Sequence, residues 1–129
     1  MLLPSYAVLA IIGVILNFKD WRMLGLTLLI AANVFVPIPS DTALSFYFCC
    51  TLAEMVVIAG ALYLKTPASL LVIEVAIVLI IAHLMGYAMD GYQAMSPYRL
   101  IVKLCEYSQL FTCIVFSPVI SPYFRTRPA

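Results

Sequence analysis

Long apolar runs separated by short polar turns account for almost the whole chain. A helix crosses a hydrocarbon core about 30 Å thick with roughly 17–25 such residues, at 1.5 Å per residue. The pattern therefore predicts an all-α integral membrane protein, a bundle of about five transmembrane helices in one polytopic domain over residues 1–129. The expected spans are residues 2–18, 23–39, 42–64, 70–92 and 100–124.

The expected turns carry charges or helix-breaking residues. Lys19 to Arg22 forms a charged turn after the first span, and the second span ends in Pro37-Ile38-Pro39. Two prolines so close together break a helix and mark a loop. Ser40 or Asp41 is then expected to cap the third helix, because short oxygen-bearing side chains accept hydrogen bonds from free backbone N–H groups.

The composition supports the membrane assignment. Hydrophobic residues make up 65% of the chain and charged residues 10%, with a mean hydropathy of +1.11. A soluble domain carries about 45–50% apolar and about 25% charged residues. Thirteen charged side chains (seven basic and six acidic) would leave large apolar patches on a soluble surface. This excludes a water-soluble globular enzyme, and the net charge of +1 gives no basis for nucleic-acid binding.

The last apolar segment, residues 100–124, permits two interpretations. It is long enough to cross a membrane, but its first half is polar. The polar residues there are Lys103, Glu106, Ser108 and Gln109. It is either a fifth span with a polar stripe, or a re-entrant or interfacial helix bent at Pro118, which leaves four spans.

The charge distribution favours the fifth span. With five spans, five of the seven Lys and Arg residues lie on one side of the membrane. Because positive loops stay in the cytoplasm, this predicts an N-terminus outside and a C-terminus in the cytoplasm. Tyr98 is then expected at the outer interface, where amphipathic rings are favoured.

Six ionisable residues fall inside or at the edge of the expected spans, and they are the candidate site. They are Glu54, Glu74, His83, Asp90, Lys103 and Glu106. Each costs about 2.5–3.5 kcal/mol at membrane depth and therefore needs a partner or a function. His83 and Asp90 share one helix face, whereas Glu74 faces the opposite way. The fourth helix thus presents polar groups to two neighbours, and Asp90 is expected to pair with Lys103.

Small and amide residues indicate close packing between helices. Ala82 and Gly86 form a small-x-x-x-small spacing, and Gly60 lies between two alanines. These positions are expected to lie where helices approach closely. Asn17 and Asn33 are expected to add interhelical hydrogen bonds near the turn between the first two spans.

Sequence patterns for catalysis or cofactor binding are absent. The chain has no P-loop, nucleophile elbow, H-E-x-x-H or dinucleotide fingerprint. Its four cysteines lie in apolar stretches without a C-x-x-C spacing, and one histidine does not make a zinc site. We therefore expect no enzyme activity, no cofactor and no metal ion.

Two functional hypotheses remain. The first is a non-enzymatic structural or interaction subunit of a larger membrane assembly, whose partners are lipids and other subunits or further copies of itself. Small size and short loops are typical of accessory subunits and of virus-encoded membrane proteins. The alternative is a small oligomeric channel or a proton-conducting, holin-like pore that uses Glu54, His83, Asp90 and Glu106. Carboxylates and a histidine at staggered depth are what a proton relay needs.

Overall fold

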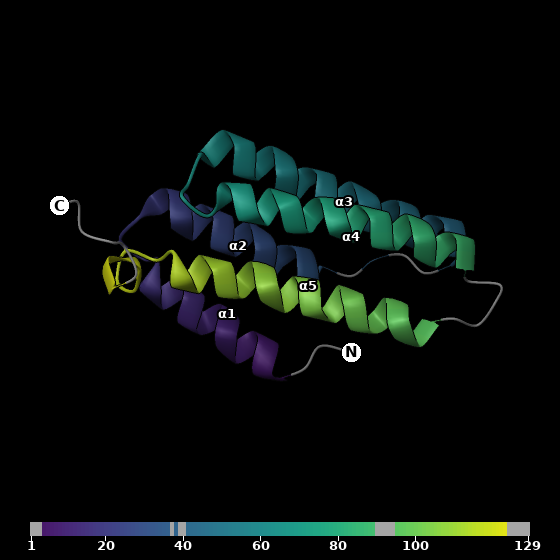
Figure 1. The fold of residues 1–129 in the computed structure, drawn as a ribbon, viewed down its shortest axis with the longest axis horizontal. Coiled ribbons are helices and arrows are strands. Elements are labelled where there is room, and N and C mark those ends of the chain that lie inside the picture. The colour runs from purple at the N-terminus through teal and green to yellow at the C-terminus, as the bar shows by residue number, and fades with distance from the viewer. Residues whose placement is uncertain (1–3, 37, 39–40, 90–94, 124–129) are drawn as a thin grey trace.

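A computed structural model describes residues 4–36, 38, 41–89 and 95–123 of the chain. Five α-helices run along the long axis of the molecule, and each reverses the direction of the one before it (Figure 1). They are α1 (Pro4–Leu16), α2 (Trp21–Phe35), α3 (Ala43–Leu64), α4 (Ser69–Met89) and α5 (Met95–Val115), followed by a short 3-10 helix, η2 (Ser121–Tyr123). The all-α class expected from the sequence is confirmed.

Four of the helices form a closed ring, and the first lies outside it. α3 packs against α4, α4 against α5, α5 against α2, and α2 against α3, whereas α1 packs against α2 and α5. The main buried cluster fills this ring with side chains from all four helices. Its helical members are Met23, Leu26, Ile30, Val57, Ala61, Val72, Ala76 and Cys113. The interior at the end of the bundle where α2 begins is therefore largely apolar, and the polar side chains buried there, such as Asn17 and Thr27, are hydrogen-bonded.

Helix length separates two of the helices from the others. Within the described residues, α3 and α4 are long and apolar enough to cross a membrane, with 22 and 21 residues. α1 and α2 are shorter apolar helices of 13 and 15 residues, which corresponds to about 20 and 22 Å.

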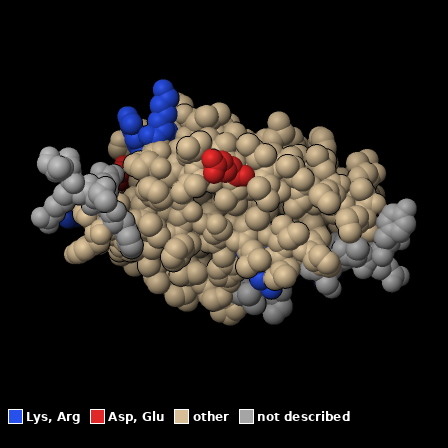
Figure 2. Space-filling model, in the orientation of Figure 1, with Lys and Arg blue, Asp and Glu red and all other residues tan. Residues whose placement is uncertain are grey.

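Figure 2 shows Lys and Arg toward the edges of one face, whose middle is uncharged apart from a small acidic patch.

The ends of the second and third helices differ from the sequence-based ranges because of local backbone chemistry. α2 stops at Phe35 and does not reach residue 39, since Val36 is extended, with φ −70° and ψ 128°. A residue that precedes a proline avoids the helical conformation. Pro37 therefore ends the helix, although it lies beyond the last helical residue. Thr42 caps α3: its hydroxyl accepts the Ser45 N–H at 3.0 Å.

The expected cap of the third helix was therefore misplaced. Asp41 is exposed and lies one residue before the observed cap, Thr42. Ser40, the other expected cap, lies outside the described residues. Threonine is a good N-cap for the same reason as serine and aspartate, so the chemistry was right and the position was wrong.

The last helix was misplaced at both ends. It begins at Met95 and ends at Val115, whereas residues 100–124 were expected. Pro97 is tolerated in the first turn because N–H groups there have no partner within the helix. Toward the other end, Pro118 lies in a turn beyond the helix, where its missing N–H cannot continue the hydrogen-bond ladder.

Asn17 joins three helices at the end of α1. Its side chain is fully buried, and Nδ2 lies 2.8 Å from Gly13 O, 3.2 Å from Thr27 Oγ1 and 3.2 Å from Cys113 O. The amide thus connects the last turn of α1 to α2 and α5. The interhelical hydrogen bond expected of Asn17 is confirmed.

Candidate functional site

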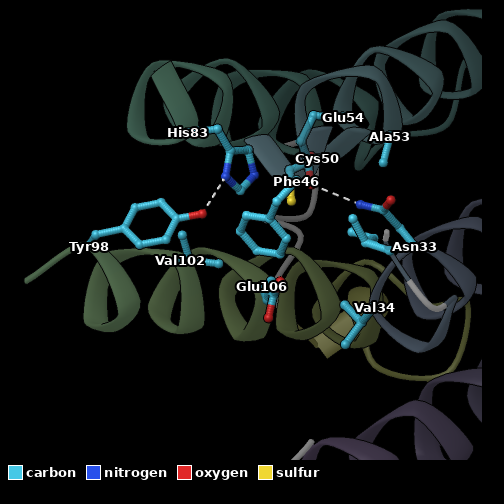
Figure 3. A pocket seen from close by; sticks show the side chains of 11 residues that line it. Asn33, Val34, Phe46, Cys50, Ala53, Glu54, His83, Tyr98, Val102 and Glu106 are labelled. Atoms are coloured by element: carbon cyan, nitrogen blue, oxygen red, sulfur yellow. Dashed lines mark hydrogen bonds between the residues drawn. The ribbon is translucent and has the colours of Figure 1, made fainter. Parts of the chain in front are cut away.

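A polar cavity of about 300 Å³ lies between α2, α3, α4 and α5 (Figure 3). It is near the point where α2 ends beside the middle of α3 (Figure 1). Eleven side chains line it. They are Asn33, Val34, Ile38, Phe46, Cys50, Ala53, Glu54, His83, Tyr98, Val102 and Glu106. The ring of helices is therefore filled mainly with apolar side chains at one end and holds a polar cavity further along.

Glu54 is the most deeply buried carboxylate of this cavity. It lies on α3 with 3% of its surface exposed. Its Oε1 accepts a hydrogen bond from Asn33 Nδ2 at 2.8 Å, whereas its buried Oε2 has no hydrogen-bond partner among the described residues. A buried polar atom without a partner costs about 1–3 kcal/mol. Glu54 is thus held by its bond to Asn33, and the buried amide of Gln109 on α5 is a second polar neighbour of this carboxylate.

His83 is fixed by a tyrosine on the next helix. The imidazole on α4 is 4% exposed, and its Nδ1 lies 2.9 Å from the hydroxyl of Tyr98 on α5. The two rings meet edge to face with centroids 5.9 Å apart. The other ring nitrogen, Nε2, makes no hydrogen bond with a described residue. Glu54 and His83 thus each keep one polar atom that makes no hydrogen bond with a described residue.

Tyr98, which was expected at the outer membrane interface, lies in the first turn of α5 and lines the cavity. Its ring turns inward and is partly buried over Gly86 of α4. A Cβ atom on Gly86 would lie 2.8 Å from Tyr98 Cδ2 and 2.9 Å from Tyr47 Cε1. Because glycine leaves this space open, two aromatic rings occupy it and Tyr98 reaches His83.

Three of the four residues expected to form a proton path line this one cavity: Glu54, His83 and Glu106. Glu106 lies on α5, on the wall opposite Glu54 (Figure 3). Asp90, the fourth, lies outside the described residues, as does its expected pairing with Lys103. The structure therefore brings together groups from three different helices.

The other two candidate residues lie outside the cavity. Glu74 is exposed on α4, and Lys103 is exposed on α5. Glu74 and His83 thus occupy outer and inner sides of the same helix, as their spacing predicts.

The small residues lie at contacts between helices of this chain. Ala82 and Gly86 are buried on α4, and Gly86 faces the aromatic rings described above. A Cβ on Gly60 of α3 would meet the end of the Leu29 side chain from α2. These positions allow helices within the bundle to approach closely.

Sequence reasoning did not identify Asn33 as the partner of Glu54. Asn33 was expected near the turn between the first two helices, but it lies close to the opposite end of α2. If α2 and α3 formed a simple hairpin, Asn33 at the end of α2 would lie beside the start of α3. The short α2 instead ends alongside the middle of α3 (Figure 1). An apolar helix carrying one amide was the available signal, since a buried amide needs a partner.

The polar groups of the cavity do not converge on one point. Within the described part of the chain, no group of three or more His, Cys, Asp or Glu could hold a metal ion. Cys50 lines the cavity as a free thiol. The arrangement suits a ligand with more than one polar end, or a series of proton transfers.

No protein-family model matches the chain, and no curated protein or solved structure matches it. The fold and site define a class: an all-α protein with two helices long and apolar enough to cross a membrane, and a polar cavity inside its bundle.

Proposed function

We propose that the chain is a non-enzymatic, multi-pass membrane protein that acts as an interaction subunit of a larger membrane assembly. In this proposal all five helices cross the membrane as an up-and-down bundle, with the N-terminus outside and the C-terminus in the cytoplasm. Only four residues connect α1 to α2 and α3 to α4. Since such turns offer little surface for binding, helix faces make the contacts with partners.

Glu74 carries this proposal. It lies five residues after Ser69, the first residue of α4, and its side chain is exposed. The four residues one turn away on the same face are all exposed and apolar: Leu70, Leu71, Ile77 and Val78. No ion pair joins Glu74 to another described residue. A charge facing lipid is costly, so a partner helix that carries Lys or Arg would stabilise this face.

The short helices support the same proposal. α1 and α2 span about 20 and 22 Å, compared with a hydrocarbon core of about 30 Å. A bilayer adapts to short helices by thinning, and the mismatch also favours association between helices. Apolar side chains such as Ile11 and Ile15 are 60% and 66% exposed on α1, so this helix offers a second surface to lipid or to a partner.

The native mass tests the subunit proposal. We expect gentle extraction from the native membrane to give a particle far larger than 14.3 kDa that contains other chains. Replacing Glu74 by Gln should release the chain from that particle, because the amide has no charge for a basic partner. Asp41→Asn, a similar exchange at an exposed position outside the helices, should leave the particle intact. Recovery of a lone 14.3 kDa chain would contradict the proposal.

A second candidate function is proton conduction, which the gathering of Glu54, His83 and Glu106 around one cavity supports. A carboxylate and an imidazole exchange protons near neutral pH, and Glu54 and His83 each keep one polar atom that makes no hydrogen bond with a described residue. Conduction by so small a chain would require an oligomer or a partner to complete the path.

Proton flux into liposomes tests this candidate. We expect liposomes that contain the purified chain as an oligomer to take up protons faster than empty liposomes, and Glu54→Gln and His83→Ala each to lower the rate about tenfold or more, since a missing relay group interrupts the path. Asp41→Asn should conduct normally. Flux equal to that of empty liposomes would exclude conduction by the chain alone.

A further inference from the structure

Three basic side chains lie at the end of the bundle where α1 turns into α2 and α3 turns into α4. Lys19 lies in the first of these turns, Arg22 is the second residue of α2, and Lys65 directly follows α3. All three side chains are exposed. Both turns lie at the same end of the molecule (Figure 1), and Figure 2 shows basic side chains projecting there. We call Lys19, Arg22 and Lys65 the basic patch.

A contact between α2 and α3 brings two of these cations to the same place. Gly25 lies three residues after Arg22, on the same side of α2, and a Cβ atom on it would lie 3.4 Å from Leu64 Cδ1. Leu64 is the last residue of α3 and directly precedes Lys65. Arg22 and Lys65 therefore lie beside one interhelical contact. Their like charges repel each other, and a nearby anion lowers this repulsion.

The basic patch has no acidic partner within the part of the chain that the structure describes. None of its side chains forms an ion pair with a described residue. The neighbouring carboxylate, Asp20, caps α2 instead: its Oδ1 accepts the backbone N–H groups of Arg22 at 3.1 Å and Met23 at 3.4 Å. Three positive charges against this one carboxylate leave the surface positively charged, so it complements an anion.

Exposed aromatic rings beside the patch indicate which kind of anion it suits. Trp21 is 64% exposed, and Tyr63, two residues before Lys65, is 80% exposed. The Arg22 guanidinium carbon lies 5.4 Å from the centre of the Trp21 ring, so the ring and the cation share one surface. Exposed Trp and Tyr rings are favoured at the headgroup level of a bilayer. Cations at that level match the headgroup of an anionic lipid, whereas a free anion gains nothing from the rings.

We propose that the basic patch binds the headgroup of an anionic phospholipid. Arg22 and Lys65 donate hydrogen bonds to the phosphate, Lys19 adds positive charge from the adjoining turn, and Trp21 lies against the lipid below its headgroup. The proposal rests on the insertion of the bundle in a membrane, as proposed above. It is independent of whether the chain acts as a subunit or conducts protons, because lipid binding requires no partner chain.

Trp21 is the single tryptophan of the chain and therefore reports on the lipids beside the patch. The purified full-length chain is reconstituted into liposomes of equal parts phosphatidylglycerol and phosphatidylcholine. One lipid or the other carries bromine on its acyl chains, which quenches tryptophan fluorescence on contact. We expect brominated phosphatidylglycerol to quench more, with a preference of about fivefold or more for this lipid, as one basic residue near an anionic surface provides.

Two outcomes of this measurement would contradict the proposal, and they differ in what they imply. Equal quenching by the two lipids would overturn the binding of an anionic headgroup and leave the membrane arrangement standing. Absence of quenching by either lipid would overturn both, because Trp21 would then not contact lipid at all.

Variants test the patch itself. Arg22→Gln and Lys65→Gly should each lower the preference for phosphatidylglycerol at least twofold. Lys65 has φ 50° and ψ 53°, a left-handed conformation that glycine adopts without strain. Lys65→Gly should therefore melt at or above the temperature of the natural chain, so that its lower preference does not come from unfolding. Unchanged preference in both variants would overturn the proposed site.

Arg99→Gln is the matched control. Arg99 is exposed on α5 near its start, at the opposite end of the bundle from the patch (Figure 1). Its replacement removes the same charge and should leave the preference unchanged. A decrease as large as that of Arg22→Gln would show that net charge alone attracts the lipid, which would overturn the patch as the binding site.

Discussion

Replacing Asn17 by aspartate is expected to destabilise the bundle by about 3 kcal/mol or more. The amide is fully buried, and its Nδ2 lies 2.8 Å from Gly13 O and 3.2 Å from Cys113 O. A carboxylate oxygen at that position has no proton to donate and repels both carbonyls, so three helices lose their junction. Thermal unfolding in detergent, followed by far-UV circular dichroism, should show a midpoint lower by roughly 10 °C or more.

Asn17→Leu separates the lost hydrogen bonds from the buried charge. Leucine has the same branching and number of side-chain heavy atoms as asparagine and also removes the donor, but it adds no charge. We expect its melting temperature to lie between those of the natural chain and Asn17→Asp. A melting temperature of Asn17→Asp equal to that of the natural chain would show that the amide does not hold α1, α2 and α5 together. A lower value for Asn17→Leu than for Asn17→Asp would show that charge is not the dominant effect.

Replacing Gly86 by alanine is expected to cost about 1–3 kcal/mol, as overpacked interiors do. The added Cβ would lie 2.8 Å from two atoms of the Tyr98 ring and 2.9 Å from Tyr47 Cε1. These are ring atoms in a packed interface, so the rings must move as units. Moving Tyr98 also breaks its 2.9 Å hydrogen bond to His83. The same thermal melt should therefore fall by roughly 5–10 °C.

Gly25→Ala is the matched control for this prediction. A Cβ on Gly25 of α2 would lie 3.4 Å from the nearest atom of Leu64, an ordinary van der Waals contact. Alanine favours a helix by about 1 kcal/mol over glycine, so this variant should melt at or above the temperature of the natural chain. Equal stability of Gly86→Ala and Gly25→Ala would contradict the proposed close approach of α4 and α5.

The two polar sides of α4 illustrate what helical periodicity predicts well. The nine-residue spacing between Glu74 and His83 places them on opposite faces. The structure has His83 buried and Glu74 exposed, as that spacing requires. Periodicity depends only on local backbone geometry. The spacing therefore predicts which residues share a helix face even when the neighbouring helix is unknown. Whether a partner covers Glu74 is a separate question, which the native-mass experiment addresses.

The boundaries of the helices were predictable only where the breaking residue was interpreted correctly. Pro37 was recognised as a breaker, but the helix already ends at Phe35 because the residue before a proline avoids the helical conformation. Pro97 and Pro118 are both prolines near the fifth helix, yet one lies in its first turn and the other beyond its end. Proline is accepted in the first turn of a helix, where backbone N–H groups have no partner within the helix. Further along, each N–H group bonds to a carbonyl, so a proline there ends the helix.

The pattern of apolar and polar residues was enough to predict the all-α class, five helices and three of the ionisable residues that line the cavity, Glu54, His83 and Glu106. Which side chains meet across the bundle depended on how the helices pack. α2 ends beside the middle of α3, so Asn33 reaches Glu54, and the space above Gly86 lets Tyr98 turn inward to His83. Such contacts depend on how far helices are offset along their axes. Packing between residues distant in the chain sets that offset, and no local pattern records it.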